Sequence, residues 1–192
     1  MGEFNNYGEM LDFHNFVELF VKNGTRVEFE KNEFFCRIGD RSPFIGYIEK
    51  GAFRYTHDSS DGKEHILSYA FENDFFGNYS SYQNKYRSIF NIQSIQKSVI
   101  YRLPVSDINS YFNSCMEAQY FGRRLSEVIL FSIEQRVVSM YCDTAEERYL
   151  KLTERCPDIL NRITLKELAS YIMVTPETLS RIRRKVLSKG KS

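Results

Sequence analysis

Residues 174–185 read VTPETLSRIRRK and carry side chains that are well suited to recognition chemistry. Ser180 and Arg181 follow Glu177 by three and four residues, so on a helix the three side chains share one face. An arginine can donate two hydrogen bonds to guanine O6 and N7, and a glutamate can accept one from the cytosine amino group. Ser180 can contact a base or a phosphate. The alternative is a plain ion pair between Glu177 and Arg181, worth about 0.3–0.5 kcal/mol.

Basic residues crowd the same end of the chain. From position 162 onward, eight Lys and Arg side chains face two acidic ones, a net charge of +6 in a chain whose total is +1. A basic segment on an otherwise acidic protein favours a polyanionic partner, although a solvated basic tail has the same composition. Phosphate contacts would position the protein, and base contacts would read sequence. The predicted DNA-contacting residues are Lys166, Thr175, Glu177, Thr178, Ser180, Arg181, Arg184 and Lys185.

Two consecutive helices are predicted to position these side chains. Thr164 and Glu167 form a T-x-x-E capping box, which starts a helix over residues 165–172. Thr175 can cap the next helix, and Pro176 suits its first position, where a missing N–H costs nothing. Two helices joined by about three residues form a helix-turn-helix motif when the positions at their crossing are apolar or small.

The positions where these two helices must cross carry suitable side chains. They are Leu168, Ala169, Ile172, Val174, Leu179 and Ile182. The turn between two such helices takes a left-handed conformation at the position of Met173, where glycine is usual. Methionine at this position departs from that pattern. A non-glycine residue in that conformation costs about 1 kcal/mol, so we expect a strained turn at Met173.

A long helix is predicted before this motif, over residues 117–142. Its apolar positions lie on more than one side, and such a helix must be covered on more than one side. About 25 residues would span roughly 40 Å, so the helix is either a core element or a dimer helix that packs on its own domain and on its twin. A second T-x-x-E box, at Thr144 and Glu147, is predicted to start a helix over residues 145–155.

The region from residue 27 to residue 103 has short apolar runs separated by turn signals, which is typical of an all-β sandwich or roll. Asp61-Gly62 predicts a type I′ hairpin turn. A short amphipathic helix is expected over residues 11–22, and Ser106-Asp107 should cap another short helix after the β region.

Metal and catalytic sites are not predicted. His57 and His65 lie on opposite arms of the hairpin but lack a third ligand, and no nucleophile–base pair stands out, so we do not expect an enzyme. The four cysteines show no C-x-x-C spacing and are expected to be buried apolar residues: Cys36, Cys115, Cys142 and Cys156. The chain shows neither a membrane-spanning run nor a signal peptide, which predicts a cytoplasmic protein.

A β-roll, a long helix and a helix-turn-helix, in this order, resemble the Crp–Fnr superfamily of bacterial transcription regulators. The likeness rests on TLKELASYIMVTPETLSRIRRK and on the β-region segments IGD, YIEKGAFRY and DFFGNYSS. It implies an α+β fold, with an antiparallel β-roll of jelly-roll type over residues 1–115 and a long dimerisation helix over 116–143. The helix-turn-helix domain, over 144–192, would lack a full wing.

The resemblance also implies a function. The E-x-x-S-R spacing of Glu177, Ser180 and Arg181 is similar to the Fnr branch. It implies a homodimer whose helix over residues 176–187 reads double-stranded DNA at a palindrome with TTGA-like half-sites. Activation would also need a contact with RNA polymerase. The alternative is a small-molecule or nucleotide-binding module whose helical C-terminal part docks on a protein partner.

A ligand site is implied by the same resemblance. Gly77, Asn78, Arg87 and Ser88 stand where related proteins bind a cyclic nucleotide. Those proteins have a glutamate after the glycine, and here Asn78 replaces it, so cyclic nucleotide is not expected and no cofactor is predicted. The same segment is rich in aromatic residues: Phe71, Phe75, Phe76, Tyr79, Tyr82, Tyr86 and Phe90. The alternative to a ligand site is therefore a structural roll whose pocket these side chains fill.

Overall fold

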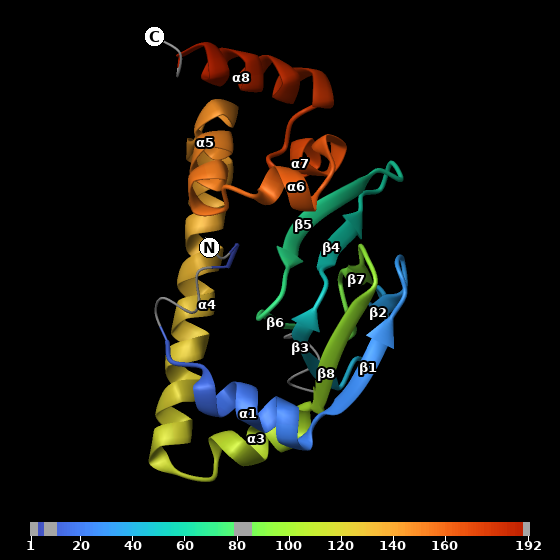
Figure 1. Ribbon diagram of the computed structural model, residues 1–192, viewed down its shortest axis with the longest axis vertical. Coiled ribbons are helices and arrows are strands. Elements are labelled where there is room, and N and C mark those ends of the chain that lie inside the picture. The colour runs from blue at the N-terminus through green and yellow to red at the C-terminus, as the bar shows by residue number, and fades with distance from the viewer. Residues whose placement is uncertain (1–3, 6–10, 79–85, 190–192) are drawn as a thin grey trace. The chain divides into compact units, whose positions relative to one another are not determined.

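The computed structural model describes residues 4–5, 11–78 and 86–189 (Figure 1). Tyr79 and Tyr82 of the aromatic group lie outside the described residues. The chain divides into two compact units, Asn5–Val128 and Ile129–Ser192, the second including Met1–Phe4. The division falls within one continuous helix, and the three-part organisation expected from the sequence remains a proposal.

The first unit contains two four-stranded antiparallel sheets, which confirms the predicted β-roll (Figure 1). One sheet has the order β1 (Thr25–Phe29), β8 (Ser98–Pro104), β3 (Phe44–Lys50) and β6 (Phe75–Gly77). The other has the order β2 (Phe34–Cys36), β7 (Asn91–Ser94), β4 (Phe53–Asp58) and β5 (Glu64–Ala70). Because β1 pairs with β8, the first and last strands of the roll lie side by side.

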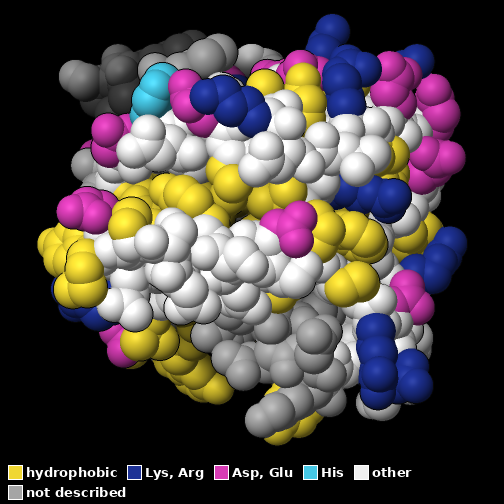
Figure 2. Space-filling model, turned by 90° about the horizontal axis from the view of Figure 1, so that it is seen from below, with side chains coloured by type: hydrophobic (Ala, Val, Ile, Leu, Met, Phe, Trp, Pro, Cys, Tyr) yellow, Lys and Arg dark blue, Asp and Glu magenta, His cyan; other side chains and the backbone are white. Residues whose placement is uncertain are grey.

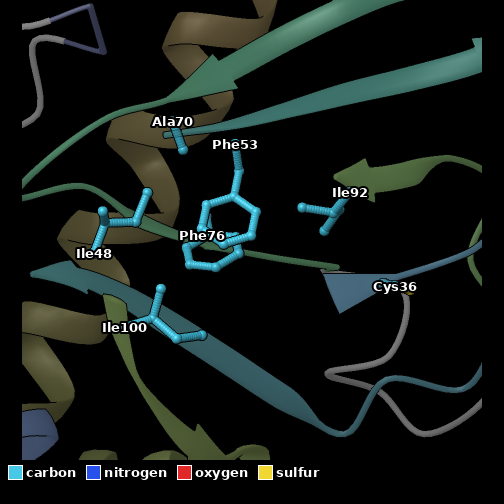
Figure 3. Packing of buried hydrophobic residues seen from close by; sticks show 7 residues of the cluster. All are labelled: Cys36, Ile48, Phe53, Ala70, Phe76, Ile92 and Ile100. Carbon is cyan, nitrogen blue, oxygen red and sulfur yellow. The ribbon is translucent and has the colours of Figure 1, made fainter. Parts of the chain in front are cut away.

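The core of the roll is built from side chains of both sheets (Figure 3). The rings of Phe53 and Phe76 are stacked, with centroids 4.5 Å apart. Gly46 makes room for this stack, since a Cβ atom there would lie 2.3 Å from Cε1 of Phe76. The buried cluster is Cys36, Ile48, Phe53, Ala70, Phe76, Ile92 and Ile100. Large apolar side chains therefore occupy the centre of the roll.

The hairpin between β4 and β5 differs from the sequence prediction in its turn. The N–H of Gly62 donates to the C=O of Ser59 at 2.8 Å, and only Gly62 of the central pair has a positive φ, +77°. A type I′ turn needs positive φ at both central residues, so the prediction for Asp61 was wrong. A three-residue loop with glycine in the left-handed conformation, forming a bulge, explains the geometry.

Helices α1 (His14–Asn23) and α3 (Val105–Phe112) cover one end of the roll and meet in an aromatic cluster. Phe16 lies at its centre, 4.7 Å from Phe75 and 5.6 Å from Phe112, measured between ring centroids. Helix α3 begins directly after Pro104, so the predicted cap at Ser106-Asp107 was wrong. Figure 2 shows that apolar side chains remain visible on this end of the molecule.

The remaining helices begin with α4 (Met116–Cys142), which confirms the predicted long helix. It is followed by α5 (Ala145–Arg155), α6 (Ile159–Arg162), α7 (Leu165–Tyr171) and α8 (Pro176–Lys189). No helix in the described part of the chain combines the length and hydropathy of a membrane span.

The cysteines follow the sequence prediction only in part. Cys36 and Cys156 are buried, as expected, but Cys115 and Cys142 are exposed. The latter two lie just before the start and at the end of α4, where helix ends are open to solvent. Among the described residues, no group of three potential ligands is close enough to hold a metal ion.

Candidate DNA interface

Both predicted helix starts of the helix-turn-helix motif are confirmed. The hydroxyl of Thr164 accepts from the N–H of Glu167 at 3.2 Å, and the carboxylate of Glu167 accepts from the N–H of Thr164 at 2.9 Å. Helix α8 begins at Pro176, and the hydroxyl of Thr175 accepts from the N–H of Thr178 at 3.2 Å. These local contacts fix where each helix begins, and therefore which residues lie at the start of α8.

The crossing of α7 and α8 is packed by the predicted side chains. Leu168, Ala169 and Leu179 are at most 1% exposed, so the faces that they form are fully covered. Ile172 and Ile182 extend this contact at 1% and 8% exposure. Because burial fixes the inner face of α8, its opposite face is left to solvent.

The turn between the helices has the strain that the sequence predicts. Met173 has φ +61°, a left-handed conformation that favours glycine. The N–H of Val174 donates to the C=O of Ala169 at 2.9 Å, and the N–H of Met173 donates to the C=O of Ser170 at 3.0 Å. This is a Schellman motif, which normally ends a helix with glycine at the position of Met173.

The residues predicted to read bases lie together on the outer face of α8. Glu177, Ser180 and Arg181 are all exposed. The N–H of Glu177 itself, at the start of the helix, holds the pKa of the Glu177 carboxyl below its usual value, with smaller effects from Thr175 and Arg181. A carboxylate that stays ionised can only accept hydrogen bonds, as contact with a cytosine amino group requires.

The predicted phosphate contacts lie on both helices of the motif. Lys166 on α7 and Arg184 on α8 are exposed. Lys185 is exposed as well, but its ammonium group forms an ion pair with Glu146 of α5. Thr175 is exposed and Thr178 half-buried at the start of α8. The predicted set thus lies at the start of α7 and along the first three turns of α8, and Lys185 also ties α8 to α5.

Two functional candidates were missed by sequence reasoning. Arg136 of α4 and Arg148 of α5 donate hydrogen bonds to the carbonyl groups of Tyr171 and Ile172 at the end of α7. Each contact joins residues more than 20 positions apart, at separations of 35 and 24. No local spacing in the sequence marks such a pair, and only the tertiary packing reveals it.

The predicted ligand residues of the β-roll are engaged within the protein. The N–H of Gly77 donates to the hydroxyl of Tyr55 at 3.0 Å, and a Cβ atom at Gly77 would lie 2.5 Å from Cδ1 of Ile45. Arg87 is exposed, and its guanidinium donates to the C=O of Gly39 at 2.8 Å. Gly77 therefore serves the packing of β6 on β3, and Arg87 ties together two loops.

Asn78 and Ser88 lie on the inner side of the same region, at 1% and 2% exposure. Both are hydrogen-bonding neighbours of the buried Cys36 thiol, whose pKa is raised chiefly by burial. Ser88 also donates to the C=O of Phe90 at 2.5 Å. An amide stands where a ribose-binding carboxylate is expected, so these residues do not fit a cyclic nucleotide and we assign none.

Comparison with known proteins places this architecture in a class. Residues 26–115 match the family model of the cyclic nucleotide-binding domain. FixK2 from Bradyrhizobium japonicum is similar at 18% identity, over 87% of this chain and 86% of that chain, with a TM-score of 0.73. The c-di-GMP-responsive global regulator CLP of Xanthomonas campestris is similar at 14% identity, over 92% of each chain, with a TM-score of 0.68.

A Crp/Fnr-family protein from Eubacterium rectale is similar at 13% identity, over 97% of this chain and 88% of that chain, with a TM-score of 0.68. Comparison with curated proteins gave no match. The first unit is thus a cyclic nucleotide-binding type of β-roll, and a helix-turn-helix follows it. The chain has the fold of the Crp–Fnr superfamily of transcription regulators, which confirms the resemblance predicted from the sequence.

Proposed function

We propose that this protein is a homodimeric transcription regulator that binds DNA sequence-specifically. Helix α8 is its recognition helix, and it reads a palindromic site with TTGA-like half-sites. The observation that carries this proposal is the exposed group Glu177, Ser180 and Arg181 at the start of a helix whose opposite face is buried against α7. The first turns of such a helix enter the major groove in helix-turn-helix proteins.

The chemistry of these side chains supports base reading over a structural role. Arg181 is exposed and forms no salt bridge within 4 Å among the described residues, although its charge contributes to the lowered pKa of the Glu177 carboxyl. It can therefore donate two hydrogen bonds at once, to O6 and N7 of guanine. The ionised carboxylate of Glu177 supplies the acceptor for cytosine on the same face.

The apolar side of α4 supports a dimer. Leu130, Ile133, Val137 and Met140 follow one another at spacings of three, four and three residues. They are 57%, 55%, 46% and 38% exposed in the single chain. A seam of this spacing packs against a copy of itself in two-stranded helical interfaces. Two recognition helices would then reach half-sites about one DNA turn, roughly 34 Å, apart.

The test compares two arginines of α8. Arg181→Ala should relax sequence preference and cost about 1–3 kcal/mol on the selected site. Arg184→Ala removes the same charge from the same helix and should weaken specific and random duplexes equally, because a phosphate contact reads no sequence. Binding is measured on both duplexes at two salt concentrations. Equal losses of Arg181→Ala on specific and random DNA would contradict the base-reading role.

A further inference from the structure

The end of α7 depends on donors from outside that helix. A helix leaves its final carbonyl groups without partners of its own. The Schellman motif at Met173 supplies donors to the carbonyls of Ala169 and Ser170. The next two carbonyls, those of Tyr171 and Ile172, are not reached by this motif.

Arg136, from α4, serves the first of these carbonyls. Its Nη2 donates to the C=O of Tyr171 at 2.7 Å, and its guanidinium carbon lies 3.8 Å from the centroid of the Tyr171 ring. The side chain is thus held twice, by a charge-assisted hydrogen bond and by a cation–π contact. Through it, α4 holds the last turn of α7 directly.

Arg148, from α5, serves the second carbonyl. Its Nε donates to the C=O of Ile172 at 2.9 Å, and its Nη1 donates to the C=O of Asp143 at 2.6 Å. Asp143 lies between α4 and α5, so one guanidinium joins that connection to the end of α7. Positive charge at the C-terminal end of a helix is favourable in addition to the hydrogen bonds.

We propose that Arg136 and Arg148 are positioning residues for the recognition helix: they hold the end of α7 on α4 and α5, and with it the turn that sets the direction of α8. The inference rests on the proposed DNA-binding function. Met173, the residue after the two bound carbonyls, has φ +61°, so the arginines hold the backbone beside its strained point. Without them the turn should relax, and the direction of α8 should be less well defined.

The first part of the test needs no DNA. Amide hydrogen exchange is followed in Arg136→Met and Arg148→Met, with Arg155→Met as the matched control. Arg155 has the same charge, but its guanidinium lies 5.1 Å from the Phe4 ring centroid instead. The N–H groups of Met173 and Val174 should exchange at least about tenfold faster in the first two variants. Each of these variants lacks a charge-assisted hydrogen bond from an arginine to a carbonyl group at the end of α7, so the turn opens more easily. Exchange in α5 should not change.

A second substitution separates positioning from general stability. Met173→Gly relieves the strain and should slow exchange at Val174 much more in Arg148→Met than in Arg155→Met, where the turn is still held. Unchanged exchange in both arginine variants, or equal acceleration throughout α5, α7 and α8, would overturn the proposal. If a methionine variant fails to fold, Arg136→Lys and Arg148→Lys, which keep the charge but lose the planar fork, take its place.

DNA binding completes the test on the full chain. Arg148→Met should lose at least about tenfold on the selected duplex and much less on random duplex, since the phosphate contacts remain. Arg155→Met should lose little affinity, and equally little on both duplexes. A larger loss of affinity in Arg155→Met than in Arg148→Met on the selected duplex would contradict the positioning role. If the unmodified protein prefers no sequence, the proposed function fails, whereas the exchange result still decides whether the arginines hold the turn.

Discussion

At the scale of single residues, Met173 carries a clear local strain. Its φ of +61° suits glycine, and its side chain is 54% exposed, so little packing is lost on truncation. Met173→Gly should therefore raise the free energy of unfolding by about 0.5–1 kcal/mol, the relief of strain being partly offset by the greater freedom of glycine in the unfolded chain. Urea denaturation measures this change.

Met173→Ala is the matched control for that substitution. It removes the same side chain but keeps a Cβ atom in the left-handed conformation, so it should give no gain in stability. Stabilisation by alanine as large as that by glycine would show that the side chain, and not the backbone, carries the cost.

Cys156 gives a prediction on pH at the same scale. Burial, with a hydrogen bond to Asp158, raises the pKa of its thiol from 9.0 to about 11. Between these values the unfolded chain has lost the proton and the folded chain has kept it, so stability falls as pH rises from about 9 to about 11. The unfolding free energy should fall more steeply there for the unmodified protein than for Cys156→Ala. Parallel curves of unfolding free energy against pH for the two proteins would contradict the raised pKa of Cys156.

Single residues were predictable from the sequence where their partners are local. The contacts of Thr164 with Glu167 span three residues, and the left-handed Met173 follows from the spacing of the two helices. Asp61 was misassigned because a two-residue and a three-residue hairpin loop share the Asp-Gly signal. Arg136 could not be found, since its acceptor lies 35 residues away.

At the scale of elements, the capping box of α7 should contribute measurably to stability. Thr164→Ala leaves the N–H of Glu167 without its acceptor and should cost about 1 kcal/mol. Thr164→Ser retains the hydroxyl and should cost much less. The free energies of unfolding in urea compare the two variants, and an equal loss in both would show that the methyl group matters more than the hydrogen bond.

The elements themselves were largely predictable. Helix α5 runs from Ala145 to Arg155, as its capping box predicted, because caps and apolar spacing are both local signals. The order of strands in each sheet was not predictable. Thr25 pairs with Arg102 and Phe34 with Gln93, and pairing across such distances depends on the packing of the whole roll.

At the scale of the whole molecule, the proposed dimer gives a test on α4. Val137→Glu places a charge in the apolar seam and should shift the protein from dimer to monomer, because a buried unpaired carboxylate is costly. Gln135→Glu adds the same charge about half a helical turn away, on the opposite side, and should leave the dimer intact. Sedimentation equilibrium separates the outcomes, and a dimer that survives Val137→Glu would contradict this interface.

Selection from random duplexes by the purified protein would show whether α8 reads DNA sequence. We expect enrichment of a palindrome with TTGA-like half-sites whose centres are about one helical turn apart. Selection with Arg181→Ala should no longer enrich this palindrome, while selection with Arg184→Ala should still enrich it. Failure to enrich any sequence, both for the protein alone and with cell extract added, would contradict sequence-specific recognition by this helix.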